Sequence, residues 1–150
     1  IGSGMGAELG SMKVSEQIDA MEVSSTRPMR FLVVTRVLAA TLMIPVLVLY
    51  ADLLGIMGSW AGSNIKGSVS FVLFFNQALR SVEFTDFLPA VIKTFFFGAA
   101  IGLVGCYQGY SAGRGTESVG VAANSAVVIA SLLVIIIDLI AVQITDMLFY

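Results

Sequence analysis

Histidine is absent from this 150-residue sequence, and cysteine occurs only once, at Cys106. The side chains that most often act as general bases, thiol nucleophiles or zinc ligands are therefore nearly missing, and no Cys/His cluster or carboxylate set has metal-ligand spacing. A lone cysteine cannot form a disulfide within the chain, so we expect Cys106 to be a small packing residue. We predict no catalytic residue, no metal site and no cofactor held by this chain.

Two further absences concern phosphate chemistry. The sequence contains no Gly-x-x-x-x-Gly-Lys-Ser/Thr loop, the segment that cradles nucleotide phosphates in P-loop proteins. Basic residues number only eight, they are scattered, and the net charge is −2, whereas nucleic-acid binding requires clustered positive charge. The pattern therefore excludes a role on nucleic acid and gives no sign of nucleotide hydrolysis by this chain.

Apolar residues dominate what is present. They make up 57% of the sequence and charged residues only 12%, about half the share found in soluble domains. Three runs, at residues 37–58, 89–107 and 119–143, are long enough to cross roughly 30 Å of hydrocarbon as helices. Each must be helical, because lipid cannot pair with an exposed backbone amide. The sequence predicts an all-α, polytopic membrane helical bundle, with residues 1–150 forming a single domain.

The distribution of basic residues predicts the orientation of the spans, because such residues favour the cytoplasmic side. This places residues 1–36 and the loop between the second and third spans inside, and leaves the C-terminus, Tyr150, outside. The external segment contains the apolar run 71–79, which is too short to span and is expected to form a short interfacial helix. Five basic residues support the inner assignment and three the outer one: Lys13, Arg27, Arg30, Arg36 and Arg114 against Lys66, Arg80 and Lys93.

Residues 6–22 are the one densely charged, helix-prone stretch of the chain. Ser15 is placed to cap a short helix from Glu16 to about Ser24. Val14, Ile18 and Met21 are predicted to share its apolar face, and acidic residues recur on another face at positions 16, 19 and 22. Such a helix can rest on the membrane surface or contact a soluble partner. The acidic residues fit anionic lipid poorly, since interfacial helices usually carry Lys and Arg.

Small residues and a proline mark the spans themselves. The second span carries a stripe of glycines at helical spacing, which lets helix backbones approach closely. The stripe can pack within one subunit or form a dimer seam or a moving interface. Pro45 removes one backbone hydrogen bond from the first span, so we expect a kink there, either as a fixed bend or as a hinge. The stripe consists of Gly98, Gly102, Gly105 and Gly109.

Three charged residues lie within or near the spans, where an unpartnered charge is costly. Asp52 can reach the outer interface, and Lys93, one turn inside the second span, can extend outward. Asp138 is expected either to be hydrogen-bonded in the interior or to lie at the interface. A proton relay through Asp138 is the functional alternative, although the sequence offers no second buried carboxylate beside it.

The charged stretch carries a family resemblance. The run AELGSMKVSEQIDAM, from Ala7 to Met21, resembles the signature of MlaE/YrbE-type permeases, the membrane subunits of bacterial lipid-transporting ABC systems that work with MCE proteins. A second block, GLVGCYQG at 102–109 followed by GTESVGVAANSAVV at 115–128, is similar to another conspicuous segment of that family. The chain starts at Ile1, with glycines at positions 2, 6 and 10 as in a close-packed helix, so we expect an N-terminal truncation.

The resemblance implies a function and a set of partners. It implies a homodimeric permease in the inner membrane of a bacterium, with a cytoplasmic ATPase subunit that binds the ATP and a periplasmic MCE-domain protein that exchanges phospholipid or a similar amphiphile. It also implies that Glu8 lies near the ATPase and that the following helix seats in a groove of that subunit. The coupling residues of this helix would be Glu16, Gln17, Ile18, Asp19, Ala20 and Met21.

Two other functions stay open on the residues alone. One is a secondary transporter driven by an ion gradient, in which Asp138, Asp52 and Lys93 would be the coupling groups. The other is a membrane scaffold that transports nothing and recruits a soluble protein through residues 16–21. The substrate, the direction of transport and the residues that line the lipid path do not follow from the sequence.

Overall fold

The computed structural model describes the backbone of residues 1–25, 27–67, 69–81 and 84–149. These residues form six α-helices and one short π-helix without a strand among them, so the predicted all-helical class is confirmed. Tyr150, whose external position the charge pattern predicts, lies outside the described residues. In chain order the elements are α1 (Gly2–Val14), α2 (Gln17–Val23), η1 (Met29–Val33), α3 (Val34–Lys66), α4 (Phe71–Ser81), α5 (Phe84–Tyr110) and α6 (Thr116–Phe149).

Among the residues that the structure describes, three helical segments are long and apolar enough to cross a membrane: Met29–Ile65, Phe87–Tyr110 and Thr116–Leu148. Each contains one of the three predicted runs and extends beyond it at both ends. The 33 residues of α3 alone would measure about 50 Å at 1.5 Å per residue, more than the hydrocarbon thickness of roughly 30 Å. The helices therefore continue into the polar layers, where composition no longer marks their ends.

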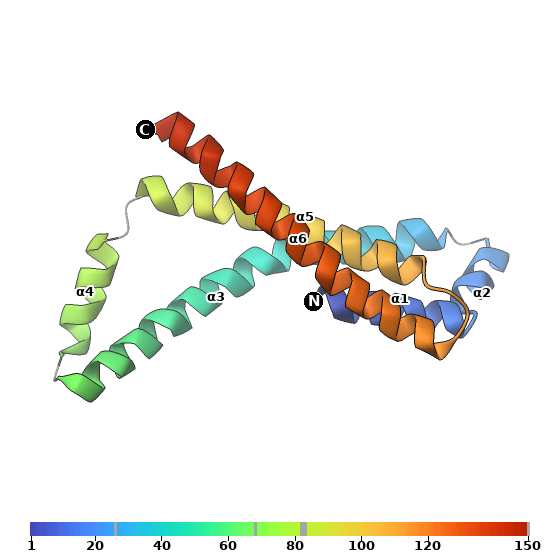
Figure 1. Cartoon of the computed structure of the whole chain (residues 1–150), viewed down its shortest axis with the longest axis horizontal. Coiled ribbons are helices and arrows are strands. Elements are labelled where there is room, and N and C mark those ends of the chain that lie inside the picture. The colour runs from blue at the N-terminus through green and yellow to red at the C-terminus, as the bar shows by residue number, and fades with distance from the viewer. Residues whose placement is uncertain (26, 68, 82–83, 150) are drawn as a thin grey trace.

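Helix α5 lies in the middle of the bundle and packs against α1, α3 and α6. Figure 1 shows α2 and the loop between α5 and α6 at one end of the molecule and α4 at the other. The loop and α2, which belong to the two segments that the charge pattern assigns to the cytoplasm, thus share one end. The start of α1 does not, because N lies in the middle of the molecule and Gly2 faces Ile101 of α5, so residues 1–36 are not all placed at that end. The predicted interfacial helix, observed as α4, lies at the opposite end. Helix α3 contains Pro45 and changes direction along its course, so that its second half diverges from α5 (Figure 1).

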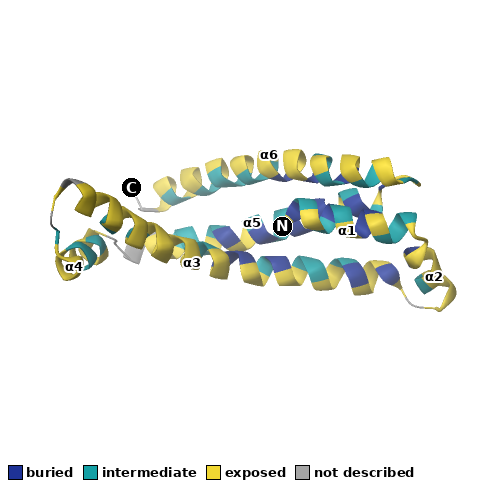
Figure 2. Cartoon of the chain, turned by 90° about the horizontal axis from the view of Figure 1, so that it is seen from below, coloured by how far each residue is buried: buried dark blue, intermediate teal, exposed yellow. Residues whose placement is uncertain are grey.

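The buried core is small and lies toward the end that carries α2. Leu9, Ile18, Leu32 and Cys106 form one cluster, contributed by α1, α2, η1 and α5 in turn. Elsewhere the long helices are buried only where they face one another, and their outer sides are exposed (Figure 2). Large apolar residues make up much of this outer surface, as expected of helices that meet lipid or other membrane helices.

Candidate functional site

The acidic helix α2 begins one residue later than predicted and is not capped by Ser15. The Ser15 hydroxyl instead donates to the carbonyl oxygen of Ser11 at 2.8 Å, and Ser15 is the C-terminal cap of α1. The capping prediction is therefore wrong. A serine hydroxyl can bond a carbonyl four residues back in a preceding helix as readily as an amide ahead of it, and the sequence did not reveal that α1 reaches Val14.

Glu16 occupies the junction between α1 and α2 with an unusual backbone. Its φ is 58° and its ψ is 15°, in the left-handed region that disfavours residues with a Cβ atom. The amide of Glu16 donates to Lys13 O, and its carbonyl accepts from Ala20 N, so the residue ends one helix and starts the next. This conformation turns the chain sharply and points α2 away from the axis of α1.

The two faces of α2 differ as the sequence predicts. Ile18 is 3% exposed and inserts into the buried cluster, and Met21 packs against the same cluster. Glu16, Asp19 and Glu22 are all exposed. The apolar face is confirmed for Ile18 and Met21, whereas Val14, predicted to share it, is the last residue of α1. The acidic face is confirmed for Asp19 and Glu22, and Glu16 is exposed at the N-cap just before α2. Ile18 holds α2 on the rest of the chain, so the outward surface consists of the acidic residues together with Gln17, Ala20 and Val23, which are also exposed.

Tyr110, at the C-terminal end of α5, connects this region to the membrane helices. The Lys13 ammonium donates to the Tyr110 carbonyl at 2.7 Å and lies 5.6 Å from the centre of its ring. The Tyr110 hydroxyl lies 3.5 Å from Glu22 Oε1 on α2. A cation at the end of α5 also suits the negative end of the helix dipole. The sequence does not reveal this cluster, because Lys13 and Tyr110 are 97 positions apart and no local pattern joins them.

Glu8 is paired within the chain. Its Oε1 accepts a hydrogen bond from Arg36 Nη2 at 2.6 Å, which joins α1 to α3. The Glu8 side chain is 61% exposed and that of Arg36 only 18%. The family resemblance implies that Glu8 lies near the ATPase, but no local pattern indicates its partner Arg36, which follows α2 in the chain.

The glycine stripe of α5 faces two neighbouring helices of the same chain. A Cβ atom on Gly98 would lie 2.7 Å from the Ala40 carbonyl oxygen of α3, and Gly102 also faces α3 at Val37. On Gly109 it would lie 2.6 Å from Leu9 Cβ of α1, and Gly105 also faces α1. Real Cβ atoms do not approach so closely, so these glycines allow α5 to contact both α1 and α3.

Lys93 and Asp138 form an ion pair between α5 and α6. The Lys93 ammonium lies 2.8 Å from Asp138 Oδ1, and the two side chains are 30% and 48% exposed. The prediction that Lys93 extends outward stays untested, and the structure adds a partner for it on the next helix. Asp52 lies exposed on α3.

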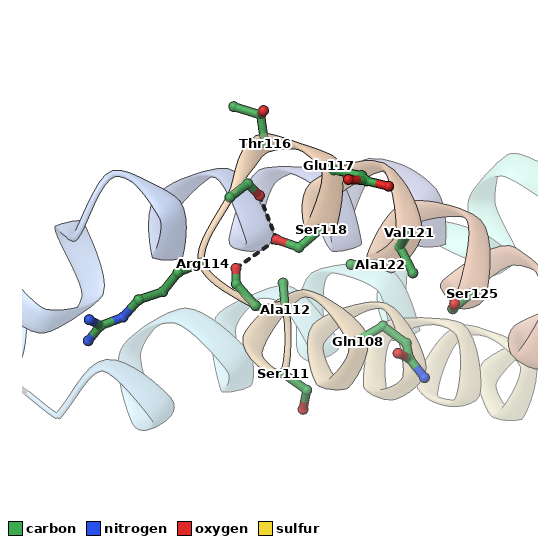
Figure 3. Close-up of a pocket in the computed structure, with 12 residues that line it drawn as sticks. Gln108, Ser111, Ala112, Arg114, Thr116, Glu117, Ser118, Val121, Ala122 and Ser125 are labelled. Carbon is green, nitrogen blue, oxygen red and sulfur yellow. Dashed lines mark hydrogen bonds between the residues drawn. The ribbon is translucent and has the colours of Figure 1, made fainter.

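The loop between α5 and α6 borders a cavity of about 600 Å³ (Figure 3). The Ser118 hydroxyl lies 2.6 Å from the carbonyl oxygens of both Gly113 and Gly115 and fastens the loop to the start of α6. Arg114 extends away from this loop in Figure 3. Among the residues described, no group of three or more His, Cys, Asp or Glu side chains could hold a metal ion.

Long apolar helices around a glycine-lined α5, with a two-faced acidic helix at one end, are the features of a multi-pass membrane protein. Comparison of the sequence with known protein families identifies the family within this class. The profile described as Permease MlaE matches residues 1–144, and the chain belongs to this family.

Curated relatives agree with this assignment. A probable ABC transporter permease protein of Rickettsia typhi is 36% identical over 149 residues, which are 99% of this chain and 56% of that protein. A probable ABC transporter permease protein of Synechocystis is 34% identical over 138 residues, 92% of this chain and 52% of that protein. The chloroplast protein TRIGALACTOSYLDIACYLGLYCEROL 1 of Arabidopsis thaliana is 34% identical over 138 residues, 92% and 39% of the two chains. The chain spans about half the length of the bacterial relatives it matches.

Proposed function

We propose that this chain belongs to the permease subunit of an ABC transporter and that a separate ATPase subunit binds α2. The observation that carries this proposal is the outward acidic face of α2, with Glu16 and Asp19 exposed while Ile18 anchors the helix from beneath. A helix held in this way can be pushed by a partner without detaching from the bundle. The relatives named as ABC transporter permeases support the same assignment.

We further propose that the substrate is a phospholipid or a similar amphiphile, exchanged with a periplasmic MCE-type carrier by a homodimer in the bacterial inner membrane. The family resemblance supports this, and the name of the Arabidopsis relative contains that of a glycolipid. A groove of about 590 Å³ between α1, α3, α5 and α6 is lined mainly by apolar side chains, among them Ile44, Leu47, Ile101 and Val134. Such a lining suits acyl chains better than polar solutes.

Co-purification tests the partner directly. In the full-length permease expressed with its candidate ATPase, Glu16→Lys with Asp19→Lys should release the ATPase, because the reversed charges repel the surface that accepts acidic residues. The control is Asn76→Lys with Gln77→Lys, which adds positive charge to exposed residues of α4 at the opposite end. Retention of the ATPase by the α2 variant would contradict the proposal. Mass spectrometry of the lipids that the wild-type complex retains tests the substrate.

The Lys93–Asp138 pair favours one rival, a transporter driven by an ion gradient. An intramembrane carboxylate with a basic partner is the kind of group that such transporters protonate. Transport that persists without the ATPase and is abolished by Asp138→Asn would support this rival. Transport that requires ATP hydrolysis in reconstituted vesicles without an ion gradient would exclude it.

A further inference from the structure

The Glu8–Arg36 pair is asymmetric in its surroundings. The Arg36 side chain is mostly buried, whereas that of Glu8 is 61% exposed. Arg36 Nη2 donates to Glu8 Oε1 and lies 3.9 Å from Met12 Sδ. Its other terminal nitrogen, Nη1, is buried without a hydrogen-bond partner among the described residues. Arg36 therefore depends on Glu8 far more than Glu8 depends on Arg36.

This asymmetry predicts unequal effects of the two deletions. Removing Glu8 leaves a buried guanidinium without a counter-charge, the most damaging way to break an ion pair. Removing Arg36 leaves a carboxylate that polar surroundings can still solvate, because most of its side chain is exposed. If Glu8 only contacted a soluble partner, the effect of removing it would be the same with or without Arg36.

The pair also occupies a particular place in the chain. After α1 the chain forms α2 and η1 and then returns as α3, so Glu8 and Arg36 lie on the two helices that flank this excursion. The buried cluster beneath α2 takes Leu9 from α1 and Leu32 from η1, directly before α3. The pair joins α1 and α3, and the distance between these two helices therefore determines the shape of the site that Ile18 occupies.

We propose that Glu8 is a positioning residue that acts through Arg36: it neutralises the buried guanidinium, joins the two helices that flank α2, and thereby fixes the orientation of α2. Glu8 then contributes to coupling without contacting the ATPase. The effect on transport rests on the proposed function above, whereas the effect on the position of α2 does not.

A double-mutant cycle of Glu8→Gln, Arg36→Gln and the combined variant tests the proposal in the full-length protein. Spin labels on cysteines introduced at the exposed positions Ser24 and Thr116 report where α2 lies relative to α6, and the buried Cys106 remains unlabelled. We expect Glu8→Gln to shift or broaden the distance distribution, Arg36→Gln to change it less, and the combined variant to restore much of the wild-type distribution. If Glu8→Gln does not assemble, recovery of assembly in the combined variant supports the proposal in the same way.

ATPase binding is measured on the same set of variants. We expect Glu8→Gln to weaken binding about tenfold and the combined variant to recover most of that loss, since contacting charges couple by amounts of this order. A loss of binding that is equally large in the Arg36→Gln background would overturn the proposal, because it would show that Glu8 contacts the partner itself. Equal label distances in all four proteins would overturn it as well. The label distances can change in the four proteins as predicted while Glu16→Lys with Asp19→Lys leaves ATPase binding intact. In that case the positioning role of Glu8 stands and the proposed function fails.

Discussion

The Lys13 ammonium on α1 and the Tyr110 carbonyl at the end of α5 are 2.7 Å apart, although 97 residues separate them in the chain. The bond caps the C-terminus of the central helix with a positive charge and fixes the last turn of α1 directly before the acidic helix. The bond thus joins the C-terminal ends of α1 and α5 beside the acidic helix.

Loss of this cap should lower stability. We expect Lys13→Met to reduce the free energy of unfolding by about 1 kcal/mol, since it removes both a charge-assisted hydrogen bond and a favourable interaction with the helix dipole. Thermal unfolding of the detergent-purified protein measures the change. Arg114→Met is the matched control, because Arg114 is an exposed cation at the same end. An equal loss of stability in both variants would show that the total positive charge at this end of the molecule, and not the cap, is responsible.

The close approach of α1 and α5 predicts that a single methyl group at Gly109 is not tolerated. In Gly109→Ala the new Cβ would lie 2.6 Å from Leu9 Cβ and 2.8 Å from the Gly6 carbonyl oxygen, so the helices must separate. We expect loss of monodisperse protein in size-exclusion chromatography. Gly4→Ala is the control, because nothing lies within 4 Å of the added atom there and alanine favours the helix by up to about 1 kcal/mol. Wild-type behaviour of Gly109→Ala would refute this packing.

Two substitutions at Glu16 can separate the role of its charge from the role of its backbone conformation. Glycine adopts a φ near +58° without strain, so Glu16→Gly should stabilise the junction by about 1 kcal/mol relative to Glu16→Ala. Both variants lack the carboxylate, and both should therefore weaken ATPase binding to a similar extent. Thermal unfolding compares their stabilities, and a pull-down compares their binding. A Glu16→Gly variant no more stable than Glu16→Ala would show that the turn is not strained.

The Lys93–Asp138 pair predicts a cost for removing either partner alone. We expect Asp138→Asn to destabilise the protein by about 1–3 kcal/mol, because Lys93 loses its charged partner between two membrane helices. The double variant Lys93→Met with Asp138→Leu should recover much of this loss, since no unpaired charge remains. Chemical denaturation in detergent measures both values. Additive losses in the double variant would show that the two residues act independently.

The sequence predicts the membrane class and the three spans well, because apolar runs of this length admit few alternatives. Residues 71–79 were likewise expected to be an interfacial helix, and α4 covers them. What the sequence could not supply are the contacts between helices. From the sequence alone Arg36 is a basic residue before a span and Lys93 a side chain able to extend outward, because their partners Glu8 and Asp138 lie 28 and 45 positions away. The local prediction at Ser15 failed because two adjacent helices compete for the same hydroxyl.

Site-specific photo-cross-linking tests the role of α2 most directly. A photoreactive amino acid is placed at Asp19, which is exposed on α2, or at Gln77, which is exposed on α4 at the other end of the molecule. If α2 is the coupling helix, irradiation of the assembled transporter should join the permease to the ATPase from position 19 and not from position 77. An ATPase that co-purifies with both proteins yet cross-links from position 77 alone, or from neither, would contradict the assignment.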